Sequence, residues 1–363
     1  MYILRNNKSL FQLVAERLVR LKSLGGKNCS LPWYIMTSPM NDAATRAFFA
    51  DNNYFGLPAE DVVFFPQGVL PCLDNDGKII LETKFKCAMA PDGNGGIWTQ
   101  LKVAGIASEM KERGIKYIHV FSIDNALVRP ADPIFIGYCI SENADCGNKV
   151  LWKVDASEKV GVTAEINGKP AIVEYSDMDK ELCEKVDAAG RLVFGAGNIC
   201  NHFFTLKFVA ETILPSIGNM YHIARKKIPA LNDDTCETVK PESNNGLKLE
   251  SFIFDVFPLS KSMAVLDVER ADEFAPIKNA PGSPTDSPDT AYVMMSNLAK
   301  RQMQHAGFQL AGDLDSTECE ISPLISYAGE DLSDAKVHQQ WQWVFRNLLC
   351  RSPKKTVACP FQL

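Results

Sequence analysis

The chain has 363 residues, of which 46% are apolar and 23% charged, as in an ordinary globular protein of one large or two modest domains. Acidic residues outnumber basic ones by 44 to 38, which argues against a fold-wide basic surface for nucleic acid. The 11 cysteines form no C-x-x-C pair and the five histidines no ligand-spaced cluster, so we expect neither a disulfide framework nor a zinc site. No signal core or membrane-length apolar run occurs, and we expect a cytoplasmic protein without a membrane partner.

The first third of the chain alternates helical and strand-like patterns. After Ser9, apolar residues recur at helical spacing, and Ser9 with Gln12 forms a capping-box pattern. Short, uninterrupted apolar runs predict buried strands. The expected helices cover residues 9–24, 41–52 and 97–113, and the expected strands cover residues 31–37, 62–65, 79–81 and 116–123.

The rest of the chain continues this alternation without an internal repeat. A helix, then a strand, then Asp124 at the carboxyl end of that strand is a pattern typical of doubly wound α/β sheets. Ligands bind at the carboxyl ends of strands in such sheets. Residues 280–290 are rich in Pro, Ser and Asp and predict a mobile loop. Further helices are expected over residues 132–142, 206–224 and 290–306, and strands over residues 149–153, 160–166, 170–175 and 264–268.

A glycine-rich stretch over residues 90–96 precedes a predicted helix. Glycine allows a close backbone approach, so this turn suits a phosphate or a flat base lying on backbone amides. A plain loop with a helix cap is the alternative. The spacing of Gly93, Gly95 and Trp98 lacks the third glycine of a dinucleotide fingerprint, and the stretch 195–200 fails in the same way.

Several stretches, taken together, resemble one family. They include FFPQGVLP, MAPDGNGG, GIKYIHVFSIDN, IVEYSDM, GNICNHFF, KLESFIFDVF and EFAPIKNA, and the matching stretches run in order from about Ser9 to Glu330. This array resembles the eukaryotic UDP-N-acetylhexosamine pyrophosphorylases, which are uridylyltransferases. The resemblance implies an α/β fold with a Rossmann-like, mixed-sheet nucleotidyltransferase core over residues 1–330. It also implies synthesis of UDP-N-acetylglucosamine and pyrophosphate from UTP and N-acetylglucosamine 1-phosphate.

The resemblance implies roles for four residues on the nucleotide side. Gln67 would bind the uracil edge, because an amide offers both a donor and an acceptor. Gly93 and Asn94 would lie against the uridine. Asp124 would bind Mg²⁺, the implied cofactor, since a hard cation prefers carboxylate oxygen. From residue type alone, Gln67 could be an exposed turn residue and Asp124 a turn cap.

The resemblance also implies a sugar pocket. Gly161, Glu174 and Asn198 would form it, with the carboxylate accepting from sugar hydroxyls and the amide holding the N-acetyl sugar. Phe252 and Phe254 are expected on one face of a strand, where they would form a wall near the N-acetyl group. A surface ion pair for Glu174, a turn role for Asn198 and simple core packing for the two phenylalanines are the alternatives.

Two lysines complete the implied site. Lys248 and Lys278 would meet phosphate oxygens as point charges. Lys278 and Asp124 are the implied catalytic residues. Either lysine could instead be solvated surface.

The sequence departs from the family at both ends. The family has an N-terminal loop of the form L-x-x-G-G-x-G-T-R-L-G followed by a Lys-Gly pair, and nothing here matches it. We therefore expect a core missing its first strand and phosphate loop. Residues 331–363 are expected to be a divergent C-terminal tail. Three hypotheses stay open: the uridylyltransferase, a non-catalytic UDP-sugar-binding relative or fragment, and a relative that handles UDP-glucose or other UDP-sugars.

Overall fold

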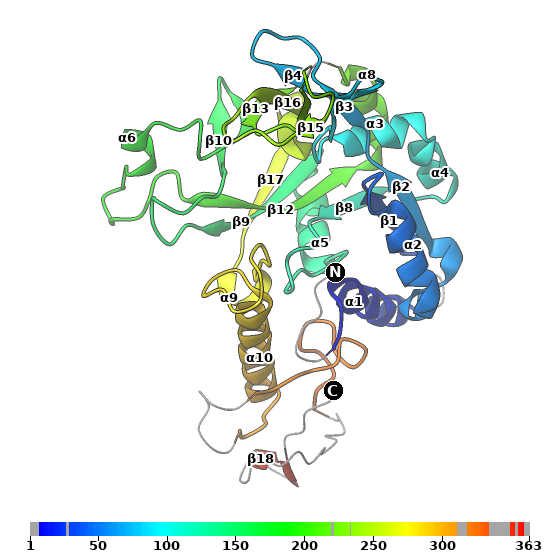
Figure 1. Ribbon diagram of the computed structural model, residues 1–363. Coiled ribbons are helices and arrows are strands. Elements are labelled where there is room, and N and C mark those ends of the chain that lie inside the picture. Colours follow the sequence, from blue (N-terminus) through cyan, green and yellow to red (C-terminus); the bar gives the residue numbers. More distant parts are fainter. Residues whose placement is uncertain are drawn as a thin grey trace.

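The computed structural model describes most of the chain around one central sheet (Figure 1). It describes residues 7–26, 29–218, 221–232, 234–310, 318–333, 349–352 and 355–358. Of the expected C-terminal tail, this includes residues 331–333 and a short antiparallel pair, β18 (Leu349–Ser352) with β19 (Lys355–Ala358). The other positions of that tail lie outside the described residues.

The central sheet contains six strands and is mixed, as expected. The order is β11-β10-β12-β9-β17, and β8 also pairs with β12. β17 runs parallel to β9, whereas β12 runs antiparallel to β8, β9 and β10. The strands are β8 (Tyr117–Phe121), β9 (Cys146–Trp152), β10 (Val162–Ile166), β11 (Lys169–Val173), β12 (Ala196–Thr205) and β17 (Met263–Asp267).

The long strand β12 carries an irregularity in its middle. Its register against β9 shifts between Asn198 and His202. Inside this bulge Cys200 adopts a left-handed conformation with φ of 53°, and its amide donates to Asn198 Oδ1 at 3.0 Å. A bulge re-aims the side chains around it. Asn198 therefore sits where the strand bends, on the stretch that the sequence singled out.

The N-terminal part forms a layer beside this sheet. α1 (Leu10–Gly25) begins at the expected cap, where Ser9 Oγ accepts from the Gln12 amide at 3.1 Å. β1 (Trp33–Thr37) pairs in parallel with β2 (Val62–Pro66), and α2 (Asp42–Asp51) lies between them in sequence. Phe49 is fully buried and meets Phe11 and Trp33 at ring distances of 5.1 and 5.6 Å. Two short 3-10 helices, η1 (Asn53–Gly56) and η2 (Ala59–Asp61), lead into β2.

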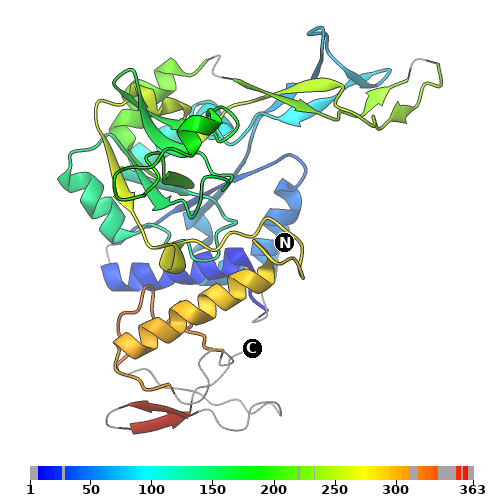
Figure 2. The same cartoon turned by 90° about the vertical axis from the view of Figure 1, so that its left-hand side faces the viewer.

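A two-part arm projects from the body, as Figure 2 shows. Its main strands are β13 (His222–Lys226) and β16 (Gly246–Glu250), which pair with each other and, through β16, with β4 (Leu73–Asp74). The remaining short strands form the pairs β3–β7, β5–β6 and β14–β15. They are β3 (Val69–Pro71), β5 (Leu81–Thr83), β6 (Lys86–Cys87), β7 (Met89–Pro91), β14 (Ala230–Leu231) and β15 (Thr238–Val239).

Three sequence expectations about local structure are wrong. The helix expected over 97–113 is split by Gly105, whose φ is +70°, into α3 (Gly96–Val103) and α4 (Ile106–Glu112). The helix expected over 206–224 ends at Ser216. It consists of α7 (Leu206–Phe208), the π-helix η3 (Val209–Ile213) and α8 (Leu214–Ser216). Phe252 and Phe254 do not lie on a strand: Phe252 caps the 3-10 helix η4 (Ile253–Leu259), which contains Phe254.

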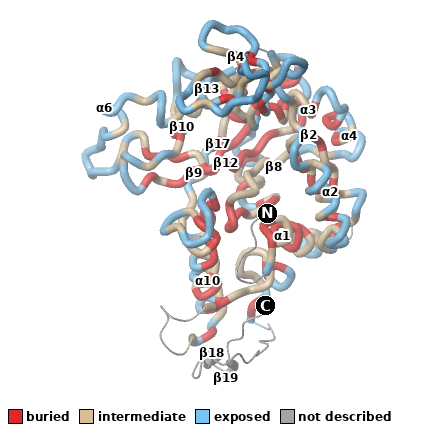
Figure 3. Tube along the Cα trace, in the orientation of Figure 1, coloured by how far each residue is buried: buried red, intermediate tan, exposed pale blue. Residues whose placement is uncertain are grey.

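The remaining helices are spread around the central sheet (Figure 1). α5 (Pro133–Ser141) starts after its Asp132 cap, and α10 (Pro288–His305) starts after Ser287. The short helices are α6 (Lys180–Cys183) and α9 (Arg270–Glu273). Buried residues follow the central sheet and the inner faces of α1 and α10, as Figure 3 shows. Within the described part of the chain, no helix combines the length and the apolar character needed to cross a membrane.

Candidate functional site

The glycine-rich stretch and Gln67 come together at one end of the arm. Gln67 Nε2 lies 3.3 Å from the Gly93 carbonyl oxygen and 3.4 Å from Asp92 Oδ1. α3 starts at Gly96, the last residue of the stretch and one residue before the predicted start of the helix. Asp92 is buried, and burial raises the pKa of its carboxyl group while the Gln67 amide opposes this rise. The turn glutamine is therefore held against the loop.

The glycines are needed for packing against another part of the chain. Gly93 has φ of +90°, and a Cβ on it would overlap the Ser251 backbone. A Cβ on Gly95 would lie 2.8 Å from the backbone of Phe252. The Gly95 amide donates to the Ser251 carbonyl at 2.9 Å, and Asn94 Oδ1 accepts from the Ile253 amide at 2.9 Å. The loop thus fixes residues 251–253, and the Asn94 side chain takes part in this.

Gly161, Glu174 and Asn198 also lie together. The backbone amide of Asn198 donates to the Gly161 carbonyl at 2.8 Å. A Cβ on Gly161 would come within 2.8 Å of Glu174 Oε1. Glu174 is half-buried just after β11. Burial raises the pKa of its carboxyl group, and the nearby Asp177 raises it further. This carboxylate has no hydrogen-bond or ion-pair partner among the described residues.

An aromatic stack stands beside this group. The rings of Phe252 and Phe254 stack at 5.2 Å, and the His222 ring lies 4.5 Å from that of Phe252. His222 Nε2 also contacts Asp255 Oδ1 at 2.8 Å, and Asp255 Oδ2 accepts from the Phe252 amide. The charges of His222 and Asp255 both act on Glu174. Sequence reasoning missed His222 and Asp255, because they are 33 residues apart and only the folding of β13 beside η4 joins them.

Asp124 and Lys278 are brought together from distant parts of the chain. The Ile277 amide donates to the Asp124 carbonyl at 2.9 Å, so Lys278 follows directly after a residue paired with Asp124. Burial raises the pKa of the Cys200 thiol to about 12; the Asp124 charge adds to the rise and the Lys278 charge opposes it. Lys278 also acts on Glu174. These charges therefore share one region with the β12 bulge.

Lys248 lies apart from this group in its local contacts. It stands on β16 opposite Ala224, in the arm, and its charge acts on the Cys72 thiol, whose pKa is raised by burial. The structure thus joins Lys278 to Asp124 and Glu174 but records no such link for Lys248.

Asp124 offers a donor of the type that Mg²⁺ prefers. It is half-buried, and no group in the described part of the protein forms a hydrogen bond or ion pair with its carboxylate. The described residues contain no cluster of three His, Cys, Asp or Glu side chains that could enclose a metal ion. Mg²⁺ commonly binds through one or two carboxylates, substrate phosphates and water rather than in a protein cage. The donor set therefore fits a magnesium ion carried with a phosphate ligand.

The mixed sheet, with charged groups near the ends of β8 and β11 that have no partner among the described residues, fits the nucleotidyltransferase class. A family model described as UTP–glucose-1-phosphate uridylyltransferase matches residues 1–326. The chain therefore belongs to this family of nucleotidyltransferases, as the sequence resemblance implied.

Individual relatives refine this assignment. The chain is 45% identical over 347 residues to a UDP-N-acetylhexosamine pyrophosphorylase-like protein 1 of Xenopus tropicalis, which covers 90% of this chain and 67% of the relative. It is 42% identical to the UDP-N-acetylglucosamine pyrophosphorylase of Saccharomyces cerevisiae, covering 92% and 70%. The crystal structure of the uridine diphosphate N-acetylglucosamine pyrophosphorylase from Trypanosoma brucei matches with a TM-score of 0.80 and 32% identity, covering 91% and 69%. Within the family, the chain is thus similar to proteins named for N-acetylated UDP-sugars.

Proposed function

We propose that this chain is a uridylyltransferase that forms UDP-N-acetylglucosamine and pyrophosphate from UTP and N-acetylglucosamine 1-phosphate. One observation carries the proposal most directly: a backbone bond joins the Asp124 and Lys278 segments, the Lys278 charge acts on Glu174, and none of these three side chains has a hydrogen-bond or ion-pair partner in the described structure. Charged groups arranged in this way are available to a ligand. The catalytic core is proposed to span residues 1–330. The free cysteines fit a reducing, cytoplasmic compartment.

The nucleotide would bind along the glycine loop. Gln67 is held over Gly93, so its carbonyl oxygen can accept from a uracil N–H, while its amide donates to the loop. The Gly93 and Asn94 backbones would lie against the uridine. Lys248 is assigned to phosphate oxygens on the resemblance to the family, and it lies on β16 in the arm.

The N-acetyl sugar would bind between the β12 bulge and the aromatic stack. Glu174 would accept hydrogen bonds from sugar hydroxyls, and Asn198, held by its backbone to Gly161, would orient the sugar. The stacked rings of Phe252 and Phe254 supply an apolar wall for the acetyl methyl group. A sugar bound here would supply the hydrogen-bond donors that the half-buried Glu174 carboxylate lacks among the described residues.

The chemistry is the transfer of a uridylyl group. A phosphate oxygen of the sugar phosphate forms a new bond to the α-phosphorus of UTP. The bond from that phosphorus to the oxygen bridging the β-phosphate breaks, and pyrophosphate leaves with the electron pair. Such transfer needs positioning and positive charge on the phosphates rather than covalent catalysis. Lys278 supplies one charge, and a magnesium ion held by Asp124 would supply further neutralisation of the phosphate oxygens.

The proposal is tested by pyrophosphate release from UTP and N-acetylglucosamine 1-phosphate with Mg²⁺. We expect turnover by the wild type that Asp124→Ala abolishes, with weaker turnover when glucose 1-phosphate replaces the N-acetylated substrate. Binding of UDP-N-acetylglucosamine without any turnover would contradict the proposal and favour a non-catalytic UDP-sugar-binding role. Preferred use of glucose 1-phosphate would contradict the assignment of the sugar.

A further inference from the structure

The segments that carry Asp124 and Lys278 are joined by backbone hydrogen bonds. The Ile277 amide donates to the Asp124 carbonyl at 2.9 Å, and the Ala126 amide donates to the Ala275 carbonyl at 3.0 Å. Between these bonds, Asn125 and Pro276 form an antiparallel bridge. Two residues more than 150 positions apart in sequence are therefore held by a two-bond ladder, which is too short to be rigid by itself.

The Asn125 side chain reinforces this ladder. It is 2% exposed and lies between the two segments. Its Nδ2 donates to the Glu273 carbonyl at 2.7 Å, while its Oδ1 accepts from the Ala275 amide at 2.9 Å and from the Leu127 amide at 3.1 Å. One amide group thus bonds to backbone on both sides of the ladder. Neither a carboxylate nor an aliphatic side chain of the same size could satisfy both the carbonyl and the two amides.

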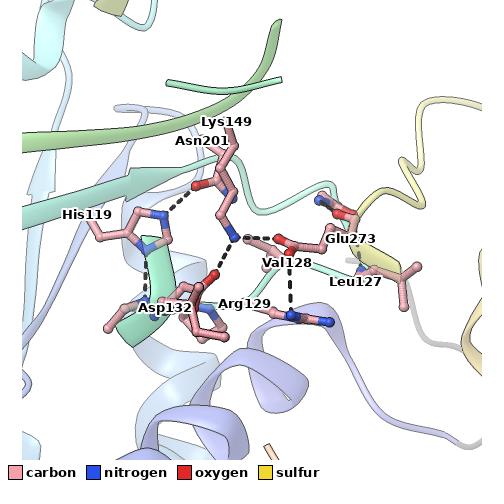
Figure 4. Close-up of polar contacts among 12 residues, drawn as sticks. His119, Leu127, Val128, Arg129, Asp132, Lys149, Asn201 and Glu273 are labelled. Carbon is pink, nitrogen blue, oxygen red and sulfur yellow. Dashed lines mark hydrogen bonds and ion pairs between the residues drawn. The ribbon is translucent and has the colours of Figure 1, made fainter. Parts of the chain in front are cut away.

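A buried ion-pair cluster anchors the same two segments (Figure 4). Lys149 on β9 is 0% exposed, and its ammonium group bonds to Asp132 Oδ2 at 2.5 Å and to the Glu273 carboxylate. Arg129 adds a contact to Glu273 at 3.4 Å. Asp132 closes the segment that starts at Asp124, and Glu273 starts the segment that ends at Lys278. Two cations and two carboxylates therefore balance in charge while they connect both segments to the central sheet.

The far side of the first segment is also held. Arg17 from α1 donates to the Ala126 and Val128 carbonyl oxygens at 2.9 and 3.0 Å. His119 Nδ1 accepts from the Ala131 amide at 2.8 Å, so its Nε2 carries the proton donated to Asn201 Oδ1. Residues 124–132 are therefore held by side chains from α1, β8 and β9.

We propose that Asn125 is a positioning residue that sets the separation of Asp124 and Lys278, with the Lys149–Asp132–Glu273 cluster as its anchor. Asn125 is buried behind Asp124 and acts through its neighbours. Its hydrogen bonds keep the metal-binding carboxylate of Asp124 and the phosphate-binding ammonium group of Lys278 at a fixed separation. The inference rests on the proposed function, because it assigns a purpose to the spacing of those two groups.

The test compares Asn125→Ala with a matched control, Asn245→Ala. The Asn245 side chain also bridges two segments, through bonds to the Ile228 amide and carbonyl at 2.7 and 2.9 Å, but it lies in the arm. For Asn125→Ala we expect kcat to fall about 10–100-fold, because small misplacements of catalytic groups cost this much. The Mg²⁺ concentration for half-maximal activity rises, while KM for UTP at saturating Mg²⁺ changes less than about threefold, since the uracil contacts come from the glycine loop.

Two readouts do not depend on turnover. Calorimetry gives the dissociation constant of UDP-N-acetylglucosamine with Mg²⁺ and with a chelator, and the gain from Mg²⁺ shrinks in Asn125→Ala but not in Asn245→Ala. Hydrogen exchange at the Ala126 and Ile277 amides speeds up by about tenfold or more in the first variant only, because local opening becomes easier. If Asn125→Ala fails to fold, Asn125→Asp replaces it, since it keeps the size and loses the donor to Glu273.

The outcomes separate the two proposals. A wild type without turnover contradicts the uridylyltransferase assignment. The hydrogen-exchange rates at the Ala126 and Ile277 amides still test the positioning role of Asn125 in that case. If Asn125→Ala keeps wild-type kcat, Mg²⁺ dependence and exchange rates, or loses only as much as Asn245→Ala, then Asn125 is not a positioning residue.

Discussion

The Lys149 cluster and the candidate site lie in adjoining parts of the same sheet, yet they differ in whether their charged side chains have partners in the described structure. In the cluster, Lys149, Asp132 and Glu273 are at most 7% exposed and each charge has a partner. In the site, Asp124 and Glu174 are half-buried and Lys278 is exposed, and none has a side-chain partner in the described structure. Only eight positions of sequence separate Asp124 from Asp132, and five separate Glu273 from Lys278.

The difference indicates which charges serve the fold and which serve a ligand. A buried charge without a partner is costly, so buried ions in stable proteins are paired. Burial alone would raise the pKa of Asp132, but the Lys149 ammonium holds it below its ordinary value. Burial raises the pKa of Glu174, and the net effect of its neighbours does not reverse this rise. The carboxylate in the cluster is satisfied by the protein, whereas the one in the site gains when a ligand supplies donors.

The first prediction, with the largest expected effect, removes one charge from the Lys149 cluster. Lys149→Met leaves Asp132 and Glu273 buried with only Arg129 nearby, and we expect a loss of about 3–5 kcal/mol in the free energy of unfolding. Urea unfolding measures it. Lys169→Met, which removes a lysine from the exposed end of β11, is the control and should change stability by less than about 0.5 kcal/mol. Equal stability of the two variants would show that the cluster does not hold the fold.

The second prediction removes one charge from the candidate site. Lys278→Met should lower kcat/KM by about 10²–10³-fold, because one charge aimed at the transferring phosphate is lost. Its thermal midpoint should stay close to that of the wild type, since the Lys278 side chain is exposed and has no partner among the described residues. Steady-state kinetics and calorimetry on the same preparation provide both values. A large fall in the midpoint with unchanged kcat/KM would reverse the assignment of Lys278.

The third prediction concerns two buried histidines and the dependence of the free energy of unfolding on pH. Burial lowers the pKa of His119 to about 4 and that of His202 to about 3. Both are neutral in the folded state, whereas an unfolded histidine titrates near 6.5. The unfolded state therefore binds more protons below that pH, and stability is lost as the pH falls. We expect about 1.4 kcal/mol per histidine per pH unit between about 6 and 4. A free energy of unfolding that is the same at pH 7.5 and pH 5, measured in urea, would contradict this.

The fourth and smallest effect concerns the glycine loop of the site. Gly95→Ala would press a methyl group against the Phe252 backbone at 2.8 Å, and we expect a loss of about 1–3 kcal/mol from overpacking. Gly137→Ala is the control, because that glycine lies inside α5 with open space around its Cβ position. The control should be stabilising by up to about 1 kcal/mol. Thermal unfolding checks both, and a neutral Gly95→Ala would show that the loop does not need its close approach to residues 251–253.

Local signals in the sequence predicted much of the fold. The cap at Ser9, the strand that ends before Asp124 and the helix that starts at Gly96 depend on neighbouring residues, so pattern and turn chemistry suffice for them. The helices expected over 97–113 and 206–224 show the limit. Apolar spacing continues across Gly105 and past Ser216, but the backbone does not.

Sequence reasoning can propose site residues where a family motif marks them, but not where only the fold brings residues together. Family motifs mark Asp124, Glu174, Asn198 and Lys278 in this way, and their roles in the site stay predictions. His222 with Asp255 and Lys149 with Glu273 have no shared motif. Their contacts span 33 and 124 positions, and residue spacing carries no information about such pairs.

The shift in the thermal unfolding midpoint on addition of UDP-N-acetylglucosamine with Mg²⁺ tests the central claim most directly. A ligand that binds only the folded state at 100 times its dissociation constant stabilises it by about 2.7 kcal/mol. We predict a clear rise for the wild type that is reduced in Glu174→Gln and in Lys278→Met and retained in Lys169→Met. A wild type whose midpoint does not move at millimolar ligand would contradict the view that these unpaired charges form a UDP-sugar site.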